Sequence, residues 1–181
     1  HQPWLTRRGE VLLPAAAIKL AGLHNVANAL AALALGEELR LPRAAMLEEL
    51  QEFAGLPHRT EWVADVDAVR YLNDSKGTNV GATLAAVAGL DGPLIVIAGG
   101  DGKRQDFAPL AAAFRGKVRL AVLIGRDAPT LAAVLADVCE VQQAATLESA
   151  VGLAHDAAQA GDTVLLSPAC ASVDMFRDYA H

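Results

Sequence analysis

Four short segments rich in glycine, lysine and small polar residues are where this chain could do chemistry. They are residues 73–79 (Asn-Asp-Ser-Lys-Gly-Thr-Asn), 99–103 (Gly-Gly-Asp-Gly-Lys), 125–127 (Gly-Arg-Asp) and 167–172 (Ser-Pro-Ala-Cys-Ala-Ser). Each follows a predicted strand, and in open α/β sheets ligands bind beyond the carboxyl ends of the strands. Small residues let backbone N–H groups approach an anion, and Lys and Arg add positive charge. The four segments therefore predict a site for an anionic ligand.

Each segment also has a structural interpretation. Residues 99–102 could form only a tight turn between a strand and a helix. Asp74 and Ser75 could cap the helix that follows them, and Ser172 and Asp174 could cap a last helix, because Asp and Ser side chains accept hydrogen bonds from first-turn N–H groups. From spacing alone these alternatives stay open.

Two further pairs are interpreted as structural. Arg126 and Asp127 are neighbours in sequence and are expected to form a solvated surface pair. Cys170 has no His partner at a recognisable spacing, so a buried thiol is favoured over a nucleophile, and Cys139 receives the same interpretation. Two cysteines cannot build a disulfide framework and no signal peptide is evident, which together fit a reducing cytoplasm.

Asn25 and Asn28 lie three residues apart at the start of a predicted helix and therefore on one of its faces. An amide offers a donor and an acceptor together, which suits the edge of a nucleotide base. The structural alternative is a helix cap with an incidental polar residue.

The apolar pattern predicts the elements that must position these segments. Residues 61–66 and 68–73 read as a hairpin, and beyond them helical faces alternate with continuous apolar runs. Helices are expected around residues 80–87, 107–114, 131–135 and 147–154, and strands at 94–98, 118–124, 138–142 and 163–166. This alternation is typical of an α/β fold in which flanking helices cover a mostly parallel sheet.

The first 55 residues are expected to be helical after an irregular start. Leu23, Val26, Leu30 and Leu33 follow helical spacing, and Gly36 is expected to loosen or end that helix. Pro42 suits the first turn of a second helix. Residues 55–57 (Gly-Leu-Pro) mark a domain boundary.

Composition narrows the class of protein. Hydrophobic residues make up 53% of the 181 residues, which is enough for a sizeable core. The net charge of −6 and the 4% aromatic content argue against nucleic-acid binding, and no apolar run is long enough to span a membrane. The sequence has neither a Gly-x-x-x-x-Gly-Lys-[Ser/Thr] phosphate loop nor residues at metal-ligand spacing.

Five strings of residues, taken in order, carry a resemblance to a known family. They are residues 22–29 (Gly-Leu-His-Asn-Val-Ala-Asn-Ala), 56–59 (Leu-Pro-His-Arg), 73–79, 99–103 and 167–172. Over nearly the whole chain they resemble the ATP-dependent Mur ligases of peptidoglycan synthesis, in particular those that add D-glutamate. The string at 73–79 is the specific one, whereas the first two are shared with folylpolyglutamate ligases.

The resemblance implies a domain assignment. Residues 1–56 would be the end of a central ATPase domain, and residues 57–181 a Rossmann-like, amino-acid-binding domain without its last segment. The chain begins with His and not with Met, and the resemblance implies that it is a C-terminal fragment. The uridine-binding domain, the phosphate loop and the Mg²⁺ ligands would lie upstream, so the fragment alone is expected to be inactive.

The resemblance also implies residue roles in a reaction that proceeds through an acyl phosphate. Residues implied at ATP are Asn25, Asn28, Arg59, Asp74 and Lys76, of which Asp74 and Lys76 also count as catalytic. Residues implied at D-glutamate are Thr78, Lys103, Ser172, Val173 and Tyr179, with Ser172 at a helix N-terminus. Tyr179 stands where the family often has Phe.

The expected partners are small molecules: UDP-N-acetylmuramoyl-L-alanine, D-glutamate and ATP with Mg²⁺. A cytoplasmic monomer that binds neither nucleic acid nor membrane is expected. The alternatives are a folylpolyglutamate-type ligase and a non-catalytic nucleotide-binding module.

Overall fold

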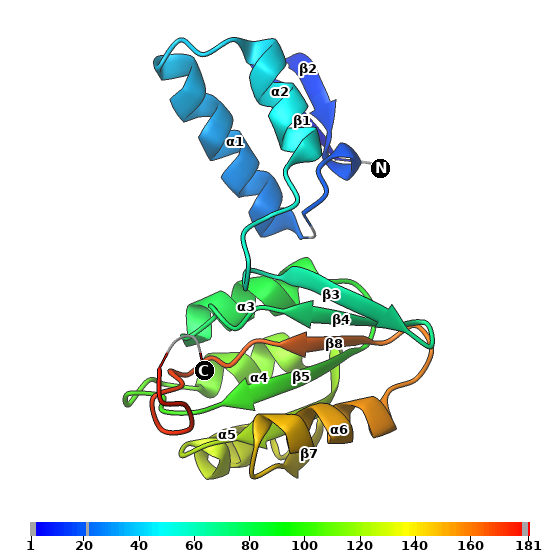
Figure 1. The fold of residues 1–181 in the computed structure, drawn as a ribbon, viewed down its shortest axis with the longest axis vertical. Coiled ribbons are helices and arrows are strands. Elements are labelled where there is room, and N and C mark those ends of the chain that lie inside the picture. Colours follow the sequence, from blue (N-terminus) through cyan, green and yellow to red (C-terminus); the bar gives the residue numbers. More distant parts are fainter. Residues whose placement is uncertain (1–2, 21, 179–180) are drawn as a thin grey trace. The chain divides into compact units, whose positions relative to one another are not determined.

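The computed structural model describes residues 3–20, 22–178 and 181 of the chain. The chain divides into two compact units, His1–Leu56 and Pro57–His181 (Figure 1). Within these described residues, no helix is both long and apolar enough to cross a membrane.

The first unit packs a β-hairpin with two helices. Strands β1 (Trp4–Arg7) and β2 (Glu10–Pro14) pair antiparallel, a short 3-10 helix (Ala15–Ala17) follows, and helices α1 (Leu23–Glu38) and α2 (Arg43–Glu52) complete the unit. Leu5 and Leu13 pair across the hairpin and are both buried, with α1 contributing Leu33 to the same core. The expectation of an irregular start was therefore wrong for residues 4–14.

Gly36 lies inside α1, which continues to Glu38, so the expectation that this glycine loosens or ends the helix was wrong. A Cβ atom on Gly36 would clash with Sδ of Met46 in α2. The missing side chain therefore lets the two helices approach closely. Pro42 occupies the position directly before α2, without a side-chain capping hydrogen bond.

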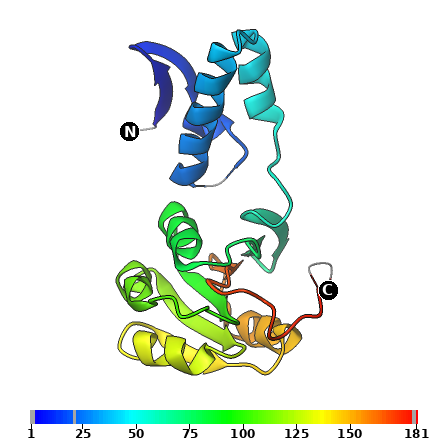
Figure 2. The same ribbon diagram turned by 90° about the vertical axis from the view of Figure 1, so that its left-hand side faces the viewer.

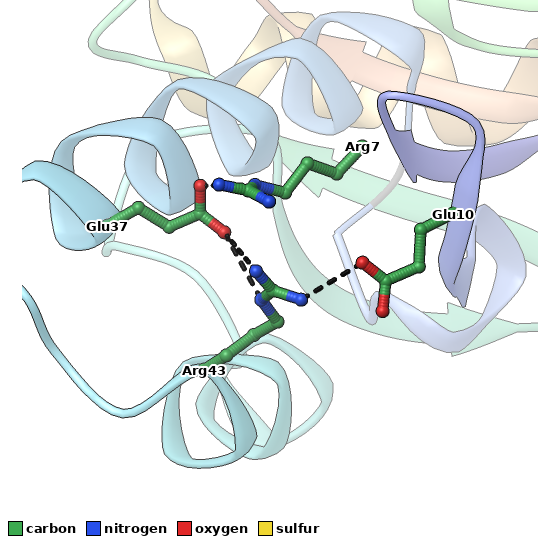
Figure 3. A network of polar contacts seen from close by, with 4 residues as sticks. All are labelled: Arg7, Glu10, Glu37 and Arg43. Carbon is green, nitrogen blue, oxygen red and sulfur yellow. Dashed lines mark hydrogen bonds and ion pairs between the residues drawn. The ribbon is translucent and has the colours of Figure 1, made fainter.

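Four charged side chains, one from each of β1, β2, α1 and α2, form a network (Figure 3). Glu37 accepts hydrogen bonds from Nε of Arg7 at 2.6 Å and from Nε of Arg43 at 3.2 Å. Arg43 also donates to Oε2 of Glu10 at 3.1 Å. The hydrogen bond from Arg7 and the positive charge of both arginines hold the pKa of Glu37 below its ordinary value.

The second unit is a six-stranded sheet in the order β3-β4-β8-β5-β6-β7. The strands are β3 (Glu61–Val66), β4 (Val69–Asn73), β5 (Leu94–Gly99), β6 (Val118–Ile124), β7 (Glu140–Gln143) and β8 (Thr163–Leu166). Only β3 and β4 pair antiparallel, and every other neighbouring pair is parallel. The predicted mostly parallel sheet is confirmed.

Helices cover both faces of this sheet. They are α3 (Val80–Gly89), α4 (Ala108–Phe114), α5 (Ala128–Leu135) and α6 (Leu147–Ala157). In Figure 2, α3, α4 and α5 lie on one face and α6 on the other. Ile95 and Ile97 share a core cluster with Ala150 and Ala154 of α6. All six residues of β5 are buried, as expected for a strand covered by helices on both faces.

The last helix expected after β8 is not found between residues 167 and 178. The N–H groups of Met175 and Phe176 instead donate to the carbonyl oxygen of Ser172, at 3.1 and 3.0 Å, and form a turn. Ser172 therefore does not stand at a helix N-terminus in this structure, which corrects that part of the expected role.

Candidate functional site

The parallel pairing of β4, β8, β5 and β6 brings the four glycine- and lysine-containing segments to one edge of the sheet. Backbone hydrogen bonds join them directly. Gly99 N donates to Pro168 O at 2.8 Å, Gly100 N to Ile124 O at 3.0 Å, and Ala169 N to Gly77 O at 2.9 Å. The segments thus form one interlocked surface and not four independent loops.

Gly99 and Gly100 are needed for this close approach. Their φ angles are +127° and +124°, which favour glycine, and a Cβ atom would clash with Ile124 O at Gly99 and with Ala171 O at Gly100. The pair therefore packs neighbouring loops together. Because α4 begins only at Ala108, residues 99–102 are not the tight strand-to-helix turn of the structural interpretation.

A cavity of about 290 Å³ opens at this edge. Its polar lining includes Thr78 and Ser172 of the predicted site, together with His58, Asn73 and Ser75. Phe176 and Leu147 are among its apolar walls. The combination of an apolar body and a few polar groups is typical of a small-molecule site.

Asp74 is the buried centre of the turn after β4. Its Oδ1 accepts from the N–H of Thr60 at 3.1 Å, and its Oδ2 accepts from Oγ of Ser167 at 2.8 Å. Gly77 N donates to the Asp74 carbonyl at 2.7 Å and closes the turn around Lys76. Asp74 does not cap α3, since Asn79 accepts from Ala82 N there.

The buried hydroxyls of Ser167 and Thr83 support Asp74. Ser167 belongs to the predicted 167–172 segment, but sequence reasoning gave neither residue a role of its own and did not place Thr83 at the site. The hydroxyls of Ser167 and Thr83 are 3.0 Å apart, and both residues are fully buried. A threonine on the apolar face of α3 was the one available signal, because buried hydroxyls need partners.

The cationic residues of the predicted site are exposed. Lys76, Lys103 and Arg59 all belong to the second unit and have solvent-exposed side chains. Val173 is exposed as well, at 70%. These residues share the edge or its neighbouring loops with Thr78 and Ser172, but they do not line the cavity.

The remaining predicted residues lie elsewhere. Asn25 and Asn28 are on α1 of the first unit, where the Asn28 amide donates to Oδ1 of Asn25 at 3.4 Å. The residue that caps α1 is Gly22, so Asn25 is not the cap. Tyr179 lies outside the described residues.

Arg126 and Asp127 do not form the expected surface pair. Nη1 of Arg126 donates to Oδ2 of Asp101 at 2.9 Å, whereas Oδ2 of Asp127 accepts from Gly102 N at 2.6 Å. Both side chains therefore bind the neighbouring 99–103 segment, because parallel pairing of β5 and β6 places the two loops side by side.

Cys170 is fully buried and belongs to the lining of the cavity. Burial raises its pKa to about 12, and the nearby carboxylates of Asp127, Asp174 and Asp101 add to the rise. Burial also raises the pKa of Cys139, which is partly buried. Neither thiol is prepared to act as a nucleophile, because the thiolate is the reactive form.

His58 lines the cavity and was left unassigned by the sequence. Its Nδ1 lies 3.0 Å from the amide nitrogen of Asn73, which donates when the His58 proton is on Nε2. Its backbone N–H donates to Oε2 of Glu61 at 2.8 Å. These contacts tie the start of the second unit to β3 and β4.

Comparison with known proteins identifies the class. Residues 58–170 match the family model described as Mur ligase, glutamate ligase domain, and the chain belongs to this family.

Within it, the chain is similar to curated proteins named UDP-N-acetylmuramoylalanine--D-glutamate ligase. The protein from Nitrosococcus oceani is 56% identical over 98% of this chain and 40% of its own length. The one from Ralstonia nicotianae is 57% identical over 94% of this chain and 34% of its own length. The chain thus spans little more than a third of these relatives, and the resemblance read from the motifs is confirmed.

Solved structures support the fold. The UDP-N-acetylmuramate-alanine ligase of Thermotoga maritima has a TM-score of 0.67 and 20% identity, over 85% of this chain and 36% of its own. The folylpolyglutamate synthase of Mycobacterium tuberculosis, complexed with ADP, also has a TM-score of 0.67 and 20% identity, over 83% of this chain and 38% of its own. The fold is therefore common to ligases that act on different substrates.

Proposed function

We propose that this chain is the C-terminal part of the ligase that joins D-glutamate to UDP-N-acetylmuramoyl-L-alanine with ATP, in cytoplasmic synthesis of peptidoglycan precursors. The observation that carries this proposal is 53–58% identity, over 94–99% of the chain, to relatives named for that activity. The likeness to other ligases is near 20% identity and supports the fold alone.

In this proposal the first unit is the end of a central ATPase domain and the second unit is the amino-acid-binding domain. The boundary between the compact units at Leu56 and Pro57 is consistent with that division. The active protein would be a monomer that contains both units and the preceding domains.

The proposed reaction proceeds in two steps. The substrate carboxylate attacks the γ-phosphate of ATP and forms an acyl phosphate with release of ADP. The amine of D-glutamate then attacks the acyl carbon, and the intermediate collapses to the amide with release of phosphate. Such chemistry depends mainly on positioning and on charge stabilisation.

Lys76 and Asp74 serve the first step in this proposal. Lys76 is exposed on the turn that the hydrogen bonds of Asp74 hold in place. It approaches the γ-phosphate and the forming acyl phosphate as a point charge. Arg59 and Asp74 lie near the ribose and phosphates, and Asn25 and Asn28 take the adenine edge.

Thr78, Ser172 and Lys103 serve the second step. The first two line the cavity, where a hydroxyl and nearby N–H groups can hold a carboxylate, and Lys103 adds a positive charge at the same sheet edge. Val173 and Tyr179 are assigned to the same pocket from the resemblance.

Mg²⁺, when bound, would neutralise phosphate charge in this chemistry. Among the described residues there is no group of three or more His, Cys, Asp or Glu that could hold a metal ion. From the family resemblance, we assign its ligands to the part of the full-length protein that precedes this chain, and the 181-residue chain alone is expected to be inactive.

The test is ligation by the full-length protein with ATP, Mg²⁺ and UDP-N-acetylmuramoyl-L-alanine. We expect ADP release and amide formation with D-glutamate. Equal ADP release with L-glutamate and a folate acceptor would favour the folylpolyglutamate alternative. Nucleotide binding without any turnover would favour a non-catalytic module.

A further inference from the structure

The segment that presents Lys103 has an unusual backbone. Lys103 and Arg104 are consecutive, and both have positive φ angles, +51° and +62°. Side chains with a Cβ atom rarely adopt this left-handed conformation, and it persists only where the surroundings hold it in place.

Two carboxylates hold the two N–H groups at this point. Gly102 N donates to Oδ2 of Asp127 at 2.6 Å, and Lys103 N donates to Oδ1 of Asp101 at 2.9 Å. Hydrogen bonds to charged acceptors are about twice as strong as neutral ones. The left-handed turn is therefore held by Asp101 of the same segment and by Asp127 of the neighbouring loop.

Arg126 completes the arrangement. Its guanidinium donates to the other oxygen of Asp101 at 2.9 Å, and its backbone N–H donates to Asp174 Oδ2 at 2.7 Å. Asp101 is in turn joined to Ala171 by two backbone hydrogen bonds of 2.8 and 2.9 Å. Three loops thus meet at Arg126. Three carboxylates lie near it, and they add to the rise in the pKa of the Cys170 thiol, of which burial is the main cause.

We propose that Arg126 and Asp127 are positioning residues that hold residues 101–104 in the conformation in which Lys103 binds a carboxylate of the amino-acid substrate. The proposal rests on the proposed function, and it gives a role to two residues of the 125–127 segment that were expected to form only a solvated surface pair.

The proposed role of Arg126 is to position a loop and not to stabilise the fold through an ion pair. The Arg126 side chain is 64% exposed, and exposed ion pairs contribute little to the free energy of unfolding. Loss of the Arg126 side chain should therefore lower the affinity for the substrate and leave stability nearly unchanged. The guanidinium also keeps an excess of carboxylates from repelling an anionic substrate at the same edge.

The first experiment uses Arg126→Ala in the full-length ligase. We expect KM for D-glutamate to rise on the order of tenfold, while kcat, KM for ATP and the urea midpoint of unfolding stay unchanged. Arg126→Lys should recover only part of the affinity, since an ammonium keeps the charge but not the planar fork. An unchanged KM for D-glutamate, or an equal rise in both KM values, would overturn the proposal.

Arg115→Ala is the matched control. Arg115 lies just after α4 and is also exposed, and its side chain donates to the Asp137 carbonyl at 3.4 Å. Its removal should change neither KM value.

A second experiment does not depend on activity. In the 181-residue chain, Asp127→Ala should increase amide hydrogen exchange of Gly102 and Lys103 by at least about tenfold, whereas Asp127→Asn, which keeps an acceptor oxygen, should increase it less. Equal exchange in all three proteins would refute the positioning role. If the full-length protein fails to use D-glutamate, the proposed function fails, and this exchange measurement still decides the positioning role.

Discussion

The Ser167 hydroxyl donates a hydrogen bond to Oδ2 of Asp74 at 2.8 Å, across 93 residues of sequence. Thr83 of α3 extends this contact, since its hydroxyl lies 3.0 Å from that of Ser167. All three residues are buried. The turn that carries Lys76 is thus anchored to the end of β8 and to α3 by buried side chains.

Thr83→Val tests this anchor with little change in shape. We expect the free energy of unfolding to fall by about 1 kcal/mol, because the buried Ser167 hydroxyl loses a partner. Urea unfolding of the 181-residue chain, followed through the fluorescence of Trp62 in the second unit, provides the measurement.

Thr163→Val is the matched control for that variant. Thr163 is also buried but lies at the opposite end of β8, in a strand, where valine is well tolerated. Its midpoint should equal or exceed that of the wild type. If both valine variants unfold at the same urea concentration, the hydroxyl network contributes nothing.

Gly77→Ala should disturb the same turn from the other side. A Cβ atom on Gly77 would clash with Oδ2 of Asp74 and come within 2.8 Å of Ser167 Oγ. We expect a loss of about 1–3 kcal/mol in the free energy of unfolding, as for other overpacked sites, and a fall in kcat of the full-length ligase as the turn shifts Lys76.

Gly152→Ala provides the comparison. Gly152 lies inside α6, and nothing within 4 Å would contact its new Cβ atom, so we expect a gain of about 0.5–1 kcal/mol from helix propensity. Two alanine variants with shifts of the same sign would argue against a steric effect at Gly77.

Substitution of the two lysines of the proposed site should change different kinetic constants. In the full-length ligase, Lys103→Ala should raise KM for D-glutamate on the order of tenfold with little change in kcat, because it removes a charge that binds the substrate. Lys76→Ala should lower kcat by about a hundredfold or more, because its charge acts on the phosphoryl transfer.

Steady-state kinetics in each substrate checks both variants, with Lys19→Ala of the first unit as the control. Lys19 is exposed and contacts the Glu52 carbonyl at 3.3 Å. An unchanged KM for D-glutamate in Lys103→Ala would remove Lys103 from the proposed pocket.

The sequence predicted the parallel sheet well because its strands are continuous apolar runs. All six residues of β5 are buried, as are the last five of β6 (120–124), so each strand gives an uninterrupted apolar signal. The hairpin of β1 and β2 escaped detection for the opposite reason. β1 ends at Arg7 and β2 begins at Glu10, and the partners of these two residues, Glu37 and Arg43, lie about 30 residues away (Figure 3).

At the site, too, local patterns were predictable and contacts between residues far apart in the sequence were not. Loop motifs predicted which segments meet at the sheet edge, since parallel pairing alone brings them together. The contacts that shape the loops are non-local: Thr83 with Ser167, and Arg126 with Asp101, join residues 84 and 25 positions apart. The adjacency of Arg126 and Asp127 in sequence was misleading, because their side chains bind a neighbouring loop.

The last prediction concerns the pH dependence of stability and rests on Cys170. Its folded-state pKa of about 12 lies above the ordinary thiol value of about 8.5, mainly because the thiol is buried. Above pH 8.5 the unfolded chain therefore loses a proton that the folded chain keeps. The contribution of Cys170 is fully present below pH 8.5 and declines as the pH rises toward 12.

Between pH 7 and pH 10 this one group should lower the free energy of unfolding by about 1 kcal/mol or more. Urea unfolding of the wild type and of Cys170→Ala at both pH values isolates the effect, because the other titrating groups are common to the two proteins. The loss on going from pH 7 to pH 10 should be smaller in Cys170→Ala by that amount. Equal losses in the two proteins would mean that the Cys170 thiol ionises as readily in the folded chain as in the unfolded one.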